Sequence, residues 1–170
     1  MLAKEQGPAL YCGGKRLVDS SLEPIGQQTG GNLRPGFGNA VVECICTGCT
    51  AVLNRQLADI LKARLPEHAI LHDWWSYLAA AYVGKVIYDP EVYILYRQHE
   101  QNVVGAKAGF WGEVQGKAAY LRKNRGKLQG QLQDFSKLYQ GDREKDALVR
   151  QVLAAEGLGG RLKIFCNRKI

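Results

Sequence analysis

The segment His72-Asp73-Trp74-Trp75 is the clearest candidate for chemistry in this sequence. An acid directly before an apolar helix can cap it, because its carboxylate accepts hydrogen bonds from the first free backbone N–H groups. The same carboxylate can act as a general base that takes a proton from an attacking hydroxyl. Neighbouring helical residues point about 100° apart, so the two indoles face different surroundings. The residues alone leave the capping role and the catalytic role of Asp73 open, and the two are compatible.

Two further segments carry residue types that could bind a ligand. The first is Thr47-Gly48-Cys49-Thr50, and the second is Tyr96-Arg97-Gln98-His99, which is followed by Asn102, Gly105 and Ala106. Arg97 offers a planar fork of donors that suits a phosphate group, although an arginine paired with a surface acid would stabilise little. His99 could be a hydrogen-bonded structural residue or could approach a metal. These segments therefore suggest an anion site without defining one.

Three cysteines, Cys44, Cys46 and Cys49, form the pattern C-x-C-x-x-C and raise the question of zinc. A structural zinc site needs four ligands, usually from two separated pairs. The fourth would have to be Cys12, Cys166 or a distant histidine. We therefore favour cysteines that pack as small apolar residues.

Composition and charge narrow the class of protein. The chain has 170 residues, 46% of them hydrophobic, and five cysteines. It has no apolar run of the roughly 20 residues that span a bilayer and no secretory signal at its start, so we expect a cytoplasmic protein with free thiols. The glycines of residues 26–39 predict a loop and fit neither a dinucleotide fingerprint nor a P-loop.

The net charge of +7 is concentrated at one end of the chain. Residues 1–106 have a net charge of −1 and residues 107–170 one of +8. A basic cluster occupies 117–127, and a second basic and apolar segment occupies 161–165. Such charge predicts peripheral contact with an anionic membrane surface. Nucleic acid would use the same charges, but the sequence contains no recognisable nucleic-acid module.

The pattern of apolar residues predicts an α/β chain. We expect a strand at 8–18 interrupted by Gly13-Gly14, extended structure at 41–54, and two short strands within 85–96 that meet at Pro90. A helix is expected around Leu57, Ile60, Leu61 and Leu65, and further helices at 74–83, 110–139 and 142–156. The helix at 74–83 is apolar on all sides and should lie in the interior.

The three segments, taken in order and with their spacing, resemble family 2 glycosyltransferases, particularly the rhamnosyltransferase-like group of bacterial polysaccharide synthesis. The resemblance covers residues 8–140. It implies a partial GT-A fold, with residues 1–106 as the C-terminal half of that domain and residues 107–170 as a basic helical extension. It also implies inverting transfer of a sugar from a nucleotide-sugar to a saccharide or a lipid-linked saccharide.

Roles for individual residues follow from the resemblance. Asp73 would be the base, and the acceptor would lie against Thr47, Gly48, His72 and either Trp74 or Trp75. Arg97, His99 and Asn102 would face the donor diphosphate, with His99 also near a divalent Mg or Mn ion.

The sequence departs from the family in one respect. It has no Asp-x-Asp motif, the usual metal ligand of the nucleotide-binding half, and we expect the chain to start just beyond that motif. Two alternatives therefore stay open: a non-catalytic remnant that only binds, and a basic module that binds nucleic acid or zinc.

Overall fold

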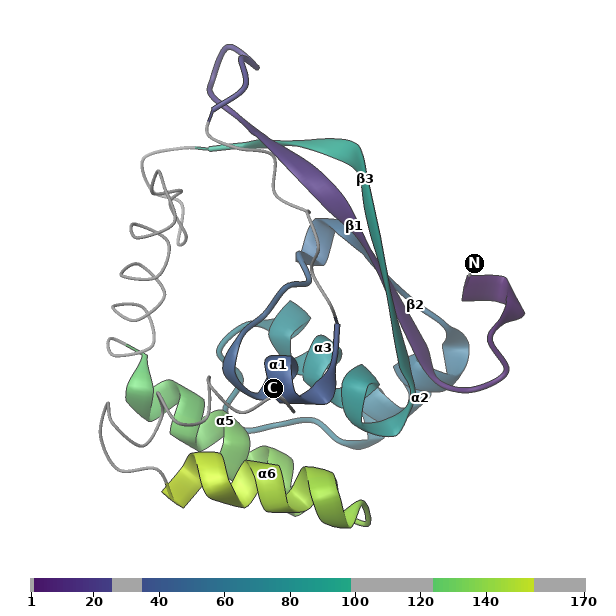
Figure 1. Cartoon of the computed structure of the whole chain (residues 1–170), viewed down its shortest axis with the longest axis vertical. Coiled ribbons are helices and arrows are strands. Elements are labelled where there is room, and N and C mark those ends of the chain that lie inside the picture. Colours follow the sequence, from purple (N-terminus) through teal and green to yellow (C-terminus); the bar gives the residue numbers. More distant parts are fainter. Residues whose placement is uncertain (1, 26–34, 99–123, 155–170) are drawn as a thin grey trace.

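The computed structural model describes residues 2–25, 35–98 and 124–154 (Figure 1). Its centre is a three-stranded sheet in the order β2-β1-β3. The middle strand β1 (Ala9–Val18) pairs antiparallel with β2 (Ala51–Leu53) and parallel with β3 (Lys85–Arg97). Helices pack against this sheet, so the predicted α/β class is confirmed.

Strands β1 and β3 are each continuous, which corrects the predicted break at Gly13-Gly14 and the predicted pair of short strands around Pro90. The register between them shifts on both sides of Gly14. A Cβ at Gly14 would lie 2.7 Å from the carbonyl oxygen of Pro90 and 2.8 Å from that of Glu91. The irregular part of β3 therefore fits against β1 because Gly14 has no side chain. Pro90 is tolerated because β3 is an edge strand.

Helices α1 (Phe37–Val42) and α3 (His72–Val83) lie on one side of the sheet (Figure 1). The prediction of a buried helix after Asp73 is confirmed, since Trp74, Tyr77 and Leu78 are almost fully buried. Helix α1 was not predicted, because residues 37–42 were assigned to a loop and to extended structure. Tyr77 of α3 stabilises the first turn of α1. Its hydroxyl accepts a hydrogen bond from the Gly36 N–H (3.2 Å) and donates one to Asn39 Oδ1 (2.8 Å).

Helix α2 (Arg55–Ala63) confirms the helix that was predicted from the spacing of leucine and isoleucine. Asn54 caps it, because its side-chain oxygen accepts a hydrogen bond from the Leu57 N–H (3.1 Å). Two single 3₁₀ turns, η1 (Leu2–Lys4) and η2 (Gly48–Thr50), complete this half of the chain. Turn η2 leads directly into β2 and carries the Thr-Gly-Cys-Thr segment.

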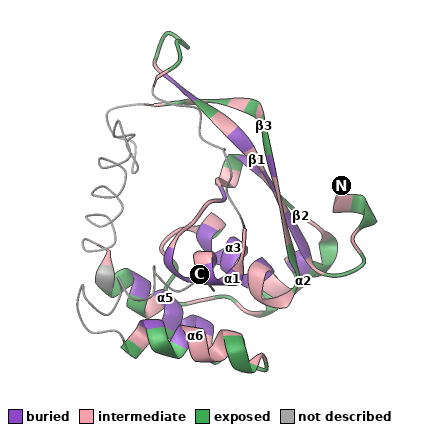
Figure 2. Ribbon diagram, viewed as in Figure 1, coloured by how far each residue is buried: buried purple, intermediate pink, exposed green. Residues whose placement is uncertain are grey.

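Helices α5 (Arg125–Leu138) and α6 (Arg143–Ala154) pack on the far side of α1 and α3 from the sheet (Figure 1). They confirm the described parts of the two predicted C-terminal helices. Their buried faces, shown in Figure 2, contribute Leu132, Phe135 and Val149 to the same core as α3. Residues 26–34, 99–123 and 155–170 lie outside the described part, and so does the boundary predicted at residue 106.

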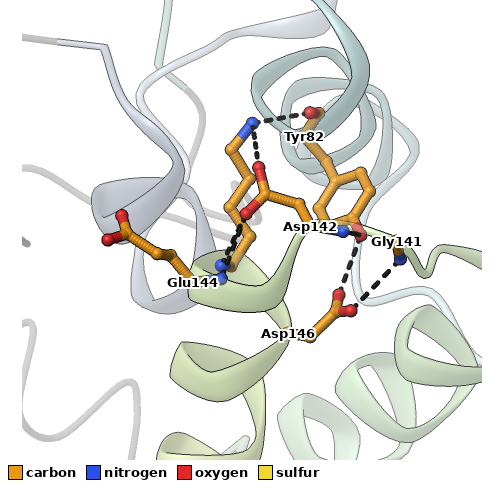
Figure 3. Close-up of polar contacts among 6 residues, drawn as sticks. Tyr82, Gly141, Asp142, Glu144 and Asp146 are labelled. Carbon is orange, nitrogen blue, oxygen red and sulfur yellow. Dashed lines mark hydrogen bonds and ion pairs between the residues drawn. The ribbon is translucent and has the colours of Figure 1, made fainter.

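A polar network ties α6 to α3 (Figure 3). The Tyr82 hydroxyl accepts a hydrogen bond from the Asp142 N–H (3.0 Å) and donates one to Asp146 (2.8 Å). Lys145 donates to the Tyr82 carbonyl oxygen (2.7 Å). Asp142 in turn accepts from the backbone N–H of Glu144 (3.1 Å). The C-terminal helices are thus fixed to the α/β core by hydrogen bonds as well as by apolar packing. None of the described helices is long and apolar enough to cross a membrane.

Candidate functional site

The carboxylate of Asp73 joins two of the segments singled out in the sequence. It lies in the first turn of α3, and Leu71 rather than Asp73 occupies the N-cap position. One carboxylate oxygen accepts a hydrogen bond from the Gly48 N–H (2.9 Å), and the other accepts from the Trp74 N–H (2.8 Å). Asp73 therefore accepts a hydrogen bond from one backbone N–H of its own helix and from one of turn η2. The turn residue, Gly48, is 25 residues away in the chain.

Lys15 of β1, which was not among the predicted site residues, connects the third segment, at Tyr96, to the surroundings of Asp73. Its ammonium group donates a hydrogen bond to Thr47 Oγ1 (2.8 Å) and lies 4.6 Å from the centre of the Tyr96 ring. Burial lowers the pKa of Lys15, while nearby negative charges, including that of Asp73, act in the opposite direction. A half-buried cation thus lies among the Thr-Gly, His-Asp and Tyr-Arg segments. Two basic residues, Lys15 and Arg16, within a mostly apolar strand were a signal that could have pointed to it.

The ring of His72 lies against turn η2. A Cβ at Gly48 would be 2.6 Å from His72 Nε2 and 3.6 Å from Asp73 Oδ2. Gly48 therefore allows both side chains to approach the backbone of the turn. His72 is exposed and Asp73 is half-buried, so this part of the cluster is open to a ligand.

The two indoles are buried in the core. Trp74 is 2% exposed and its Nε1 donates a hydrogen bond to the Ala40 carbonyl oxygen (2.7 Å). Trp75 is 5% exposed and packs edge-on against Phe135 and Tyr139. Neither ring presents a free face of the kind that stacks on a sugar. The predicted acceptor platform at Trp74 or Trp75 therefore has no counterpart in this arrangement.

The predicted diphosphate contacts are only partly placed by the structure. Arg97 is exposed at the end of β3. Because successive residues of a strand point to opposite faces, and Tyr96 contacts Lys15, Arg97 is directed away from Lys15. His99 and Asn102 lie outside the described residues, so their predicted roles stay predictions.

The described cysteines do not form a zinc site. Cys12, Cys44, Cys46 and Cys49 are free thiols, and within the described ranges no three of them bring their sulfur atoms close enough to hold one ion. Burial raises the pKa of Cys44, and a hydrogen bond with Cys12 raises that of Cys46. Both shifts favour the thiol form, as expected of cysteines packed among apolar residues.

The divalent Mg or Mn ion that the resemblance implies was placed near His99, which lies outside the described residues, so this assignment stays a prediction. Asp73 itself does not provide a second site for such an ion. Such an ion takes several oxygen ligands, yet among the described residues Asp73 belongs to no group of three ligating side chains. The ammonium group of Lys15 would also repel a cation. In the described ranges, the residues that could hold a metal are Glu67, His68 and Asp134, on other segments.

Comparison of the chain with protein-family models, with curated proteins and with solved structures found no match. The geometry of the site is therefore the basis for a functional proposal.

Proposed function

We propose that this chain is the acceptor-binding part of an inverting glycosyltransferase with a partial GT-A fold. The observation that supports it is the meeting of the Thr47-Gly48 and His72-Asp73 segments at one carboxylate. Tyr96 joins them through Lys15. These are the three segments on which the resemblance to family 2 glycosyltransferases rests. A cluster that only stabilised the fold would not need a partly exposed acid, Asp73, and a cation, Lys15, at the point where these three segments meet.

The arrangement suits the removal of a proton from a sugar hydroxyl. An ionised carboxylate has about four acceptor positions, and two of those on Asp73 are used by backbone N–H groups. The acceptor hydroxyl would donate its hydrogen bond to a remaining position. As the hydroxyl oxygen bonds to the anomeric carbon, its proton would pass to Asp73 and the bond to the nucleoside diphosphate would break. The two backbone bonds fix the direction of the carboxylate during this step.

Lys15 and His72 would complete the acceptor side. Lys15 places a positive charge near the carboxylate and within reach of an acceptor hydroxyl bound there. The exposed ring of His72 offers a hydrogen-bonding nitrogen beside Gly48. We assign both residues to orientation of the acceptor, with a saccharide or lipid-linked saccharide as its class.

A sugar-transfer assay with Asp73→Asn tests the catalytic role. In the intact enzyme, with the nucleotide-binding half present and with a panel of nucleotide-sugars and saccharides, removal of the base should lower turnover by about 10²- to 10⁴-fold. The chain alone, without an Asp-x-Asp motif, is expected to show little or no transfer. Asp59→Asn is the matched control, because Asp59 is an exposed acid on α2 whose pair with Arg55 contributes little to stability. Measurable and equal turnover in the Asp73→Asn enzyme and the unaltered enzyme would refute the base assignment.

A second candidate is a protein that binds the acceptor without chemistry. It is favoured by the absence of an Asp-x-Asp motif from the sequence. Calorimetry with a nucleoside diphosphate and Mn²⁺ separates the two. Metal-dependent binding by this chain supports the enzyme. Saccharide binding with neither nucleotide binding nor transfer supports the binding protein.

A further inference from the structure

A second polar cluster lies where the segment between α2 and α3 meets α5. Asp134, whose side chain is 6% exposed, accepts hydrogen bonds from the backbone N–H of His68 (2.7 Å). Its Oδ2 also lies 3.1 Å from Nδ1 of the His68 ring. Glu67 is the third member, and one ligand atom from each of the three residues lies within 4.8 Å of the others.

The spacing suits one small cation. Two atoms that each bind zinc at 2.0–2.1 Å, with bond angles between 90° and the tetrahedral value, lie about 2.9–3.4 Å apart. The separation of His68 Nδ1 from Asp134 Oδ2, 3.1 Å, falls in this range. Glu67 and His68 are both exposed, so small rotations of their side chains can complete the geometry.

The surroundings keep this cluster available for a metal. Gly130 allows the ring of His68 to lie against α5, since a Cβ there would be 3.3 Å from His68 Cβ and Cγ. The backbone N–H of His68 donates a hydrogen bond to Asp134 Oδ2 (2.7 Å), which fixes the direction of this carboxylate. A nearly buried carboxylate of fixed direction therefore lies beside two exposed side chains that could bind the same ion.

We propose that Glu67, His68 and Asp134 form a zinc site with two carboxylates, one imidazole and water in the fourth position. Zinc accepts this combination of nitrogen and oxygen ligands. When the ion binds Nδ1 of His68, a proton on that nitrogen is released to solvent or replaced by one on Nε2. The ion would fasten the segment 64–71, which leads directly to His72-Asp73, onto α5.

Lys137 provides an internal test of this assignment. Its ammonium group lies 3.8 Å from Asp134 Oδ1 and is 72% exposed. A positive charge at that distance competes with a cation for the same carboxylate. Replacing Lys137 with glutamine should therefore tighten zinc binding, whereas a hydrogen-bonded cluster without a metal role predicts no effect on zinc.

The experiment is calorimetric titration of the full chain with Zn²⁺ under reducing conditions, with circular dichroism to verify folding. We expect one equivalent to bind, with affinity at least about tenfold weaker in His68→Ala and Asp134→Asn and stronger in Lys137→Gln. His72→Ala is the matched control, because it removes another exposed histidine four positions away and should leave zinc affinity unchanged. No binding by the unaltered chain would overturn the proposal. So would binding that persists unchanged in His68→Ala, since the ion would then be held elsewhere.

Discussion

Asp73 shows how one side chain can combine a structural and a chemical role. Its carboxylate accepts hydrogen bonds from two backbone N–H groups, one in its own helix and one in turn η2. Such bonds would be expected of a capping acid, and they are also what holds a general base in a fixed direction. The neighbouring Lys15 adds a charge that capping does not require. The same contacts therefore stabilise the fold and prepare the site.

Gly48→Ala should separate the two roles. The added Cβ meets the outer edge of the His72 ring, and an exposed side chain can move away at little cost. We expect the free energy of unfolding to change by less than about 0.5 kcal/mol, while sugar transfer falls because His72 is displaced. Gly7→Ala is the control, since a Cβ at Gly7 has no neighbour within 4 Å. Denaturant unfolding and the transfer assay measure the two effects, and unaltered transfer would show that His72 is not part of the site.

At the level of individual residues, the sequence predicted part of the candidate site. The resemblance assigned Thr47, Gly48, His72 and Asp73 to one acceptor site, and in the structure the Gly48 N–H donates to Asp73. It did not reveal Lys15, because the contact with Tyr96 depends on how β1 and β3 pair. It also expected one of the two indoles to face the acceptor. Both are buried instead, because Trp74 bonds to Ala40 of α1 and Trp75 packs against Phe135 of α5.

The strands and helices around the Asp73 cluster are positioned by close contacts between their backbones. The irregular pairing of β1 with β3 at Gly14 changes the strand register between Cys12 and Lys15. A sequence shows the glycines and Pro90 but not their proximity, so both were taken as breaks. Helix α1 was missed for a related reason. It has only 6 residues and no side-chain cap, and it is held by contacts with Tyr77 from α3.

Gly14→Ala tests the element that orients Lys15. Its Cβ would overlap the backbone of Pro90 and Glu91, which cannot rotate away, so we expect a loss of about 1–3 kcal/mol in the free energy of unfolding. Gly126→Ala on α5 is the matched control. A Cβ there has open space, and the better helix propensity of alanine should stabilise the protein by up to about 1 kcal/mol. Urea unfolding followed by circular dichroism gives both values. Equal stability of Gly14→Ala and the unaltered chain would contradict the described pairing.

The whole molecule combines an almost neutral N-terminal portion with a strongly basic C-terminal one. Helices α5 and α6 bury their apolar faces on the shared core. Much of the positive charge, including that of 117–123 and 161–165, lies outside the described residues. We propose that this charge holds the protein at an anionic membrane, where a lipid-linked acceptor would be found.

Co-sedimentation with lipid vesicles tests this proposal. The chain should bind phosphatidylcholine vesicles that contain phosphatidylserine and should be released at high salt, because the screening length falls from about 10 Å at 0.1 M to about 3 Å at 1 M. Arg122→Glu with Lys123→Glu should weaken binding. Lys4→Glu with Lys62→Glu makes the same change in net charge elsewhere and should matter less. Equal binding to vesicles without phosphatidylserine would exclude an electrostatic membrane contact.

The most direct test of the acceptor site is a ¹H–¹⁵N NMR titration of the chain with a panel of monosaccharides and short oligosaccharides. The amide groups of Gly48 and Trp74 both donate to the Asp73 carboxylate, so their signals report any ligand that engages it. We predict saturable shifts of these two signals with at least one saccharide, while those of Glu91 and Gly141 stay unchanged. If no saccharide moves the Gly48 and Trp74 signals, or if all four signals shift alike, the cluster at Asp73 is not an acceptor site.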